Sequence, residues 1–93
     1  MILENLLKTY RELIQNNKTS LSSFHLHLLW MIDEINRMIQ TIDYDKIDKL
    51  FKINRWLGFI QGYLHSNKLR TIEELKNETR GIDSELFEMS DRK

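Results

Sequence analysis

The chain has 93 residues, with 14 Lys or Arg against 14 Asp or Glu and no cysteine. This length predicts a single domain, and a formal charge of zero disfavours a protein that binds nucleic acid through nonspecific attraction to phosphate. The lack of cysteine excludes disulfides, thiolate nucleophiles and cysteine-zinc sites. No apolar run reaches the roughly 18–20 residues of a membrane-spanning helix, and the amino terminus has no signal-peptide pattern, so we expect a cytoplasmic protein.

We expect an all-α fold, because the sequence has no proline and only three glycines, and its apolar residues recur at helical spacing. The first predicted helix covers residues 2–16 and is followed by a polar turn at residues 16–20. Its apolar face consists of Leu3, Leu7, Tyr10 and Ile14. Such a one-sided pattern is typical of a helix that packs against a core.

The second predicted helix begins at a cap between Ser20 and Ser23 and reaches about Thr41. Its predicted core stripe consists of Phe24, Leu28, Met31, Ile32, Ile35, Met38, Ile39 and Ile42. Leu26 and Trp30 point the opposite way, among charged residues. Because large apolar side chains grouped on a polar face mark contact surfaces, we predict that both bind a partner protein.

Two histidines in this helix, His25 and His27, raise the question of a metal site. Side chains two positions apart on a helix point roughly 200° away from each other, so the two rings cannot hold one ion together. We therefore predict ordinary, partly exposed histidines, and we expect neither a metal ion nor another cofactor.

The third predicted helix starts at a cap on Asp43 or Asp45 and ends near Ser66. Its apolar stripe consists of Leu50, Ile53, Leu57, Ile60 and Leu64. A second stripe, nearly opposite, consists of Trp56, Phe59 and Tyr63. A helix that is apolar on two sides lies at the centre of a fold or at an interface, so we add this aromatic stripe to the predicted partner-binding residues. Four bases recur at every third position from residue 46 to 55, with acids nearby, which favours a solvated face.

Between these two stripes lies a more polar one, formed by Asn54, Gly58, Gln61 and His65. Three interpretations are open: a contact between two copies of the chain, a pocket for a small polar ligand, or a face toward water. Glycine inside a helix costs roughly 1 kcal/mol relative to alanine, so Gly58 and Gly62 require a reason. We expect tight backbone packing at one of them, with this part of the helix covered by protein on nearly all sides.

The fourth predicted helix is short. Thr71 and Glu74 have the spacing of a capping box, and Gly81 stands where a C-terminal cap is expected. We therefore expect one domain over residues 1–81 and a tail at residues 82–93 that is partly ordered or forms a short helix. The start of this helix also offers free N–H groups to an anion. The predicted residues of such an anion site are Arg55, Gln61, Lys68, Arg70 and Arg80.

The segment from Arg55 to Gly62 reads RWLGFIQG and is followed by TIEEL at residues 71–75 and by Arg80. This block of 26 residues resembles one found in small accessory proteins of tailed bacteriophages and prophages. The chain departs from the pattern at Thr79, where those proteins usually have asparagine, and at residues 65–67, where they often have glycine. The resemblance implies an accessory protein that binds and blocks a host factor, including factors of host immunity, and it transfers no enzymatic activity.

The sequence contains no recognisable nucleophile motif, no glycine-rich phosphate loop and no forced carboxylate pair. We therefore predict a non-enzymatic small helical bundle of three main helices plus a short C-terminal helix. The function that we expect first is a phage-type inhibitor that binds a host protein in the host cytoplasm, as a homo-oligomer. The alternative is a sponge for a small anionic ligand such as a nucleotide signal. A DNA-binding helix-turn-helix is disfavoured by the neutral charge.

Overall fold

In the part of the chain that the structure describes, four helices form where the apolar residues recur at helical spacing. The computed structural model describes residues 2–17, 23–41 and 46–91, and within these ranges it contains no strand. The helices are α1 (Ile2–Asn16), α2 (Ser23–Gln40), α3 (Lys46–Ser66) and α4 (Ile72–Asp91). The predicted all-α fold class is confirmed. The caps predicted at Ser20, Asp43 and Asp45 lie outside the described residues, and Ser23 is the first residue of α2.

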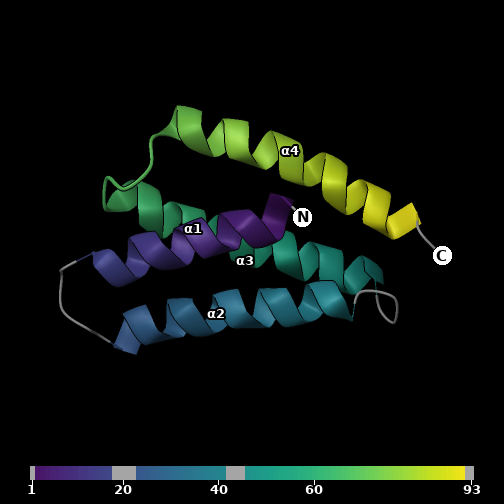
Figure 1. The fold of residues 1–93 in the computed structure, drawn as a ribbon, viewed down its shortest axis with the longest axis horizontal. Helices are drawn as coiled ribbons and strands as arrows, with labels where there is room; N and C mark the ends of the chain where they lie inside the picture. The colour runs from purple at the N-terminus through teal and green to yellow at the C-terminus, as the bar shows by residue number, and fades with distance from the viewer. Residues whose placement is uncertain (1, 18–22, 42–45, 92–93) are drawn as a thin grey trace.

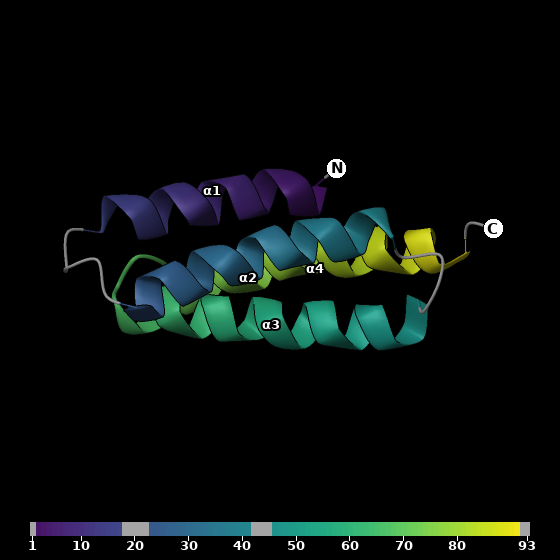
Figure 2. The same ribbon diagram turned by 90° about the horizontal axis from the view of Figure 1, so that it is seen from below.

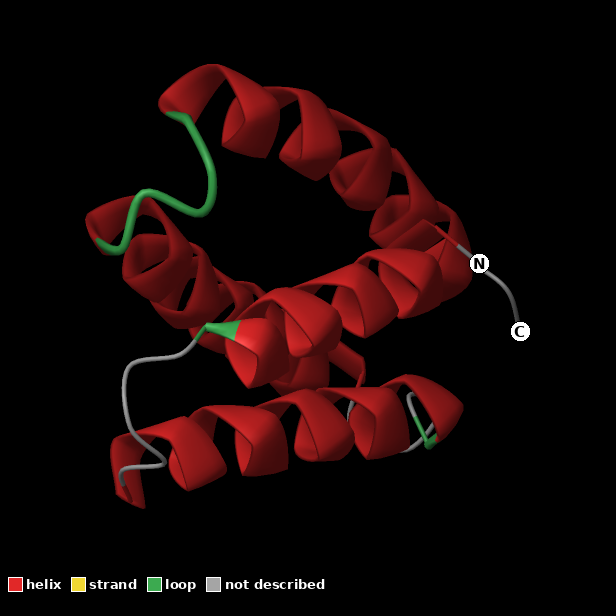
Figure 3. Ribbon diagram, turned by 60° about the vertical axis from the view of Figure 1, so that its left-hand side comes forward, coloured by secondary structure: helices red, strands yellow, loops and turns green. Residues whose placement is uncertain are grey.

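Consecutive helices run antiparallel and pack side by side, which makes an up-and-down bundle (Figures 1 and 2). α1 contacts α2 and α4, and α3 contacts the same two helices, so the bundle closes on itself. Short connections favour this topology, because neighbours in sequence then become neighbours in space. The bundle measures 43 × 27 × 18 Å. In its described part, only helices and their connecting loops are present (Figure 3).

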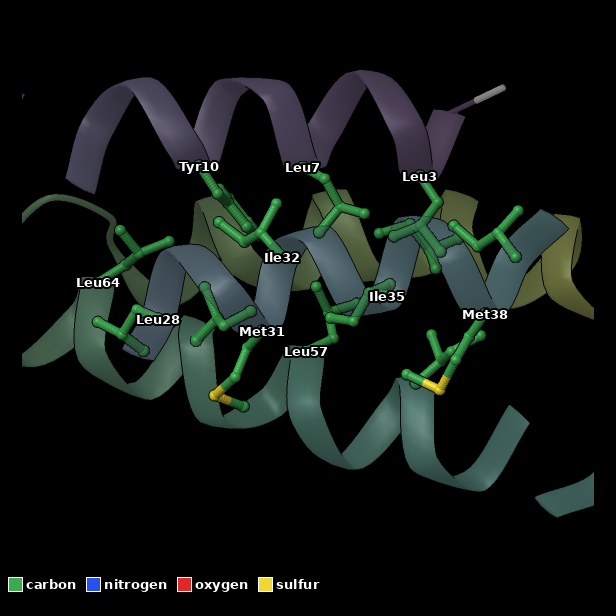
Figure 4. Close-up of a cluster of buried hydrophobic side chains, with 14 of the residues drawn as sticks. Leu3, Leu7, Tyr10, Leu28, Met31, Ile32, Ile35, Met38, Leu57 and Leu64 are labelled. Carbon is green, nitrogen blue, oxygen red and sulfur yellow. The ribbon is translucent and has the colours of Figure 1, made fainter. Parts of the chain in front are cut away.

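The core takes apolar side chains from all four helices. Figure 4 shows Leu7 and Tyr10 of α1 pointing toward Ile32 of α2. The buried apolar residues of the described chain are Leu3, Leu7, Tyr10, Ile14, Leu28, Met31, Ile32, Ile35, Met38, Ile39, Ile53, Leu57, Ile60, Leu64, Ile82 and Leu86. The predicted core stripes are therefore confirmed for most positions. Phe24 is an error, because it is 44% exposed, and Ile42 lies outside the described residues.

The fourth helix is long rather than short, because α4 continues through Gly81 to Asp91. Gly81 does not have the left-handed backbone of a C-terminal cap. Ile82 and Leu86 extend the apolar face of α4 into the core. Burying such a side chain contributes about 1.5–3 kcal/mol, which outweighs the roughly 1 kcal/mol that a helix-interior glycine costs. The tail predicted from residue 82 is accordingly helical as far as Asp91.

The reversal between α3 and α4 is fixed by backbone hydrogen bonds. The N–H of Leu69 donates to the Leu64 carbonyl at 2.8 Å, and the N–H of Lys68 donates to the His65 carbonyl at 3.0 Å. These are the two bonds of a Schellman motif, and Lys68 occupies its left-handed position with a φ of 59°. A lysine thus stands where glycine is usual.

The predicted capping box at the start of α4 is confirmed. The N–H of Thr71 donates to the Glu74 carboxylate at 2.9 Å, and the N–H of Glu74 donates to the Thr71 hydroxyl at 3.1 Å. The hydrogen bond that the carboxylate accepts from the Thr71 N–H, with the Thr71 side chain nearby, holds the pKa of the Glu74 carboxyl below its ordinary value. Because the box uses its own residues to satisfy these N–H groups, the first turn of α4 is stable without a bound anion.

The outward face of α3 is more open than predicted. A Cβ atom built on Gly58 or on Gly62 would meet nothing within 4 Å. The prediction of tight backbone packing at these glycines is therefore wrong within this chain. The physical reason is the position of the core: Ile53, Leu57 and Ile60 turn the opposite side of α3 inward, which leaves both glycines outside.

Candidate functional site

Aromatic rings line the contact between α2 and α3, the two helices that lie side by side in Figure 2. The rings are Phe24, His27 and Trp30 of α2 and Trp56, Phe59 and Tyr63 of α3. We call these six residues the aromatic surface. Three of the predicted partner-binding residues of α3 and Trp30 of α2 belong to it, so the structure brings the two predicted aromatic groups together.

One half of the aromatic surface is a row of stacked groups. The rings of Trp30 and Trp56 lie 5.6 Å apart, and the ring of His27 stacks on Trp30 at 5.5 Å. The ammonium group of Lys52 lies 4.9 Å from the centre of the Trp56 ring, in the geometry of a cation–π contact. These contacts span both helices and hold the two indole rings in defined positions.

The other half surrounds a hollow. Phe24 lies 6.0 Å from Phe59 and 5.7 Å from Tyr63, in the edge-on and tilted arrangements that aromatic pairs prefer. Beside them opens a cavity of about 610 Å³, which we call the aromatic hollow. It is lined by Phe24, Phe59, Gly62, Tyr63, Ser66 and Asn67. Gly62 widens this hollow, because it has no side chain to fill it.

The wall of the hollow is anchored from inside by a hydroxyl group. The Tyr63 hydroxyl lies 2.6 Å from Nε2 of His25 and accepts a hydrogen bond from the Asn17 side chain at 3.0 Å. His25 is buried, so its predicted partial exposure is wrong. It lies on the core face of α2, and the hydroxyl of Tyr63 satisfies its polar ring there. His27 is exposed, as predicted.

The aromatic surface remains open to solvent despite these contacts. Trp30 is 48% exposed and Phe59 is 50% exposed, while Trp56 and Tyr63 are partly buried. Leu26, one helical turn before Trp30, is 59% exposed. Large apolar side chains held in place yet left exposed are typical of protein-binding surfaces. Sequence reasoning missed Phe24, because its position near the edge of the core stripe made it look like a core residue.

A polar network occupies the opposite flank of α3. Tyr10 of α1 donates its hydroxyl proton to Glu78 at 2.8 Å and accepts a hydrogen bond from the Gln61 side chain at 3.2 Å. Gln61 also donates to the Thr79 hydroxyl at 3.1 Å, and Arg70 donates to the other oxygen of Glu78 at 3.1 Å. Burial, with the Glu78 carboxylate beside it, raises the pKa of the Tyr10 phenol, so this group stays a donor. We call these five residues the polar network.

The five predicted anion-binding residues do not form one site in the structure. Gln61 and Arg80 line a second cavity, of about 470 Å³, which we call the polar hollow. Its full lining is Gln61, Ile72, Leu75, Lys76, Thr79 and Arg80. Arg70 instead pairs with Glu78 inside the polar network, while Arg55 and Lys68 are exposed and do not line this hollow. Sequence reasoning missed Lys76, although its spacing of four residues from Arg80 places both on one side of α4.

No protein-family model, curated protein or solved structure matches the chain. Within residues 2–17, 23–41 and 46–91, no helix has both the length and the apolar composition needed to cross a membrane. The same ranges contain no group of three or more His, Asp or Glu side chains arranged to hold a metal ion.

Proposed function

We propose that the protein is a non-enzymatic binding protein that covers the surface of a partner protein with its aromatic surface. The observation that carries this proposal is the pair of half-exposed rings, Trp30 and Phe59, held in fixed positions beside an open hollow. A few residues carry most of the binding energy at protein interfaces, and tryptophan and tyrosine are enriched among them. The resemblance of residues 55–80 to phage accessory proteins extends the proposal: the partner is a host factor, and binding inhibits it.

Rigidity favours this role. Binding costs less when the contacting side chains are already ordered, because less rotational freedom is lost. Trp30 is ordered by Trp56 and His27, and Phe59 is ordered by Phe24. The anchored hydroxyl of Tyr63 fixes the wall between these rings and the core. The surface is thus pre-arranged for a partner.

Affinity capture from a bacterial lysate tests the proposal. The bait proteins are the unaltered chain, a Trp30→Ala/Phe59→Ala variant, and a Lys8→Ala control on the exposed side of α1. We expect one or more proteins to be retained by the unaltered chain and by the control, and to be lost with the double variant. Equal retention by all three baits would contradict the proposed surface.

Self-association, which the sequence also predicts, has a candidate face on α3. Ile47 and Phe51 are exposed on the outward side of α3, on the same side as the open Gly58 and Gly62. In an antiparallel pair of α3 helices, Ile47 of one copy faces Gly62 of the other when Phe51 faces Gly58, because both spacings are four residues. We propose this large-to-small packing as the route to a homo-oligomer; sedimentation of the unaltered chain and of Phe51→Ala tests it.

The second candidate function, a sponge for a small anionic ligand, is favoured by the polar hollow. There Lys76 and Arg80 stand beside the amide of Gln61 and the hydroxyl of Thr79. A thermal-shift screen against nucleotides tests it, since a ligand at 100 times its Kd adds about 2.7 kcal/mol of stability. We expect Arg80→Ala to abolish any shift. No shift with any nucleotide would exclude this ligand class.

A further inference from the structure

The net charge of zero hides a strong separation of charge between two neighbouring helices. α3 contains the bases Lys46, Lys49, Lys52 and Arg55 and one acid, Asp48. α4 contains the acids Glu73, Glu74, Glu78, Asp83, Glu85, Glu88 and Asp91 and two bases, Lys76 and Arg80. Three of the six residues of the aromatic surface, Trp56, Phe59 and Tyr63, belong to α3, the more basic of these two helices.

Two of these bases border the aromatic surface directly. Lys52 is exposed and lies over the Trp56 ring, and Arg55 is exposed one helical turn before Phe59. The acid of α2 on this side, Glu34, is already bonded to Arg37 at 2.7 Å. That bond, more than Lys52, lowers the pKa of the Glu34 carboxyl. The contact of Lys52 with Trp56 leaves its ammonium protons able to donate to a further acceptor.

We propose that the partner segment bound by this surface is an acidic peptide with one bulky apolar anchor. The anchor fills the aromatic hollow between Phe24, Phe59 and Tyr63, and carboxylates of the same segment contact Lys52 and Arg55. This inference rests on the proposed function and adds the chemistry of the partner. Apolar burial in the hollow supplies affinity, while the two bases select the sign of the charge.

The spacing along α3 sets the pattern of the peptide. At 1.5 Å per residue, Arg55 lies about 6 Å and Lys52 about 10 Å along the helix from Phe59. An extended peptide rises about 3.3 Å per residue and its alternate side chains share one face, so acids two and four residues from the anchor point toward Arg55 and Lys52. The expected motif is one large apolar residue with Asp or Glu at those two offsets.

Selection from a random twelve-residue peptide library, followed by titration of single peptides, tests the inference. Both tryptophans of the chain lie in the aromatic surface, so intrinsic tryptophan emission reports directly on its occupancy. We expect enriched peptides to carry the motif, and replacement of their acids by Gln to weaken binding at least tenfold. Lys52→Glu/Arg55→Glu should weaken binding by at least the same factor. The control for the change of charge is Lys8→Glu, at an exposed base of α1 that lines neither hollow, and it should leave binding unchanged.

The outcomes separate this inference from the proposed function. Enriched peptides that are lost with Phe59→Ala but show no excess of acids would overturn the partner chemistry and leave the proposed function standing. A selection with no peptide dependent on Phe59 would overturn both. Equal affinity for a single-stranded oligonucleotide of twelve nucleotides would show that charge alone drives binding. A dimer of the chain that dissociates on Lys52→Glu/Arg55→Glu would identify a second copy as the occupant of this surface. Either result would overturn the proposal that the partner is an acidic peptide. Lys8, Lys52 and Arg55 are all exposed, and circular dichroism checks that each variant stays folded.

Discussion

The two contacts that α3 makes with its neighbours in sequence are held together in different ways. Against α2, apolar side chains fill the contact, and α2 buries six of its apolar residues: Leu28, Met31, Ile32, Ile35, Met38 and Ile39. Against α4, no residue from Ile72 to Arg80 is buried, Leu75 is partly buried, and the Gln61 side chain of α3 donates a hydrogen bond to Thr79. The contact between α2 and α3 leaves aromatic rings exposed at its surface. In the polar network, by contrast, the polar side chains form hydrogen bonds with one another.

This difference indicates where the structure keeps capacity for a partner. The polar network uses both oxygens of Glu78, the hydroxyl of Tyr10 and the amide of Gln61 on one another. Groups that are satisfied inside the molecule gain little from an outside ligand. The exposed rings of the aromatic surface still have solvent to exclude, so burial by a partner remains favourable there.

Among the changes that test this difference, the largest effect is expected at the polar contact. Tyr10→Phe should lower the free energy of unfolding by about 1–3 kcal/mol, because it leaves Gln61 and Glu78 without their shared partner. Urea unfolding followed by circular dichroism measures it. The raised pKa of Tyr10 also makes stability depend on pH, because the folded state holds the phenol proton more tightly than the unfolded state does. Above about pH 10 the free energy of unfolding of the unaltered chain should therefore fall, by up to about 1.4 kcal/mol per pH unit. That part of the alkaline loss should be missing in Tyr10→Phe.

A double variant decides whether the network acts as a unit. Tyr10→Phe and Glu78→Gln should together cost less than the sum of the two single changes, by at least about 0.5 kcal/mol. Strict additivity would mean that α4 is held by its apolar residues Leu75, Ile82 and Leu86, and the contrast between the two contacts would fail.

The next effect concerns the open face of α3. In the single chain, Gly58→Ala and Gly62→Ala should each raise the free energy of unfolding by about 1 kcal/mol, since the added methyl group meets nothing there and the helix loses a flexible residue. Thermal unfolding at two protein concentrations measures this gain. Gly81→Ala is the matched control, because a Cβ atom added at this position would lie in ordinary contact with the Ile2 side chain at 3.7 Å. A gain at position 81 but a concentration-dependent loss at position 58 would show that a second copy packs against α3.

The capping box at the start of α4 gives a comparable effect. Thr71→Ala should cost about 1 kcal/mol, because the N–H of Glu74 loses its acceptor. Hydrogen exchange of α4 measures where the loss occurs. If the first half of α4 depends on polar contacts, protection should fall over residues 72–80 more than over residues 82–91. A uniform fall along α4 would contradict that division.

A smaller gain is expected in the turn before this helix. A residue other than glycine in the left-handed region costs roughly 1–2 kcal/mol, and glycine loses up to roughly 1 kcal/mol more entropy on folding. Lys68→Gly should therefore raise the free energy of unfolding by about 0.5 kcal/mol. The comparison variant is Lys76→Gly, which lies within α4 and should lower it. Equal effects at both positions would contradict the role given to the left-handed φ of Lys68.

The sequence predicted those features that depend on local spacing. Helical periodicity located α1 to α3, and the Thr71–Glu74 spacing located the capping box, because each of these features is decided within a few residues. The prediction that α4 ends at Gly81 was wrong, because the preference of glycine for a helix end is outweighed by the burial of Ile82 and Leu86. That burial depends on the packing of α4 against the other helices. The polar network could not be predicted for the same reason. Tyr10 and Glu78 are 68 positions apart, and no local pattern around either residue indicates that the two are in contact.

The smallest predicted effect tests whether the exposed apolar residues of α2 serve folding at all. Leu26→Ser should change the free energy of unfolding by no more than about 0.5 kcal/mol, because Leu26 is 59% exposed. Leu28→Ala, two positions along the same helix, is the matched control and should cost about 2–5 kcal/mol through the cavity that it leaves. If Leu26→Ser were as costly as the control, Leu26 would belong to the folded core rather than to the binding side of α2. A small loss of stability together with weaker retention of a captured partner would instead mean that the protein keeps this leucine for binding.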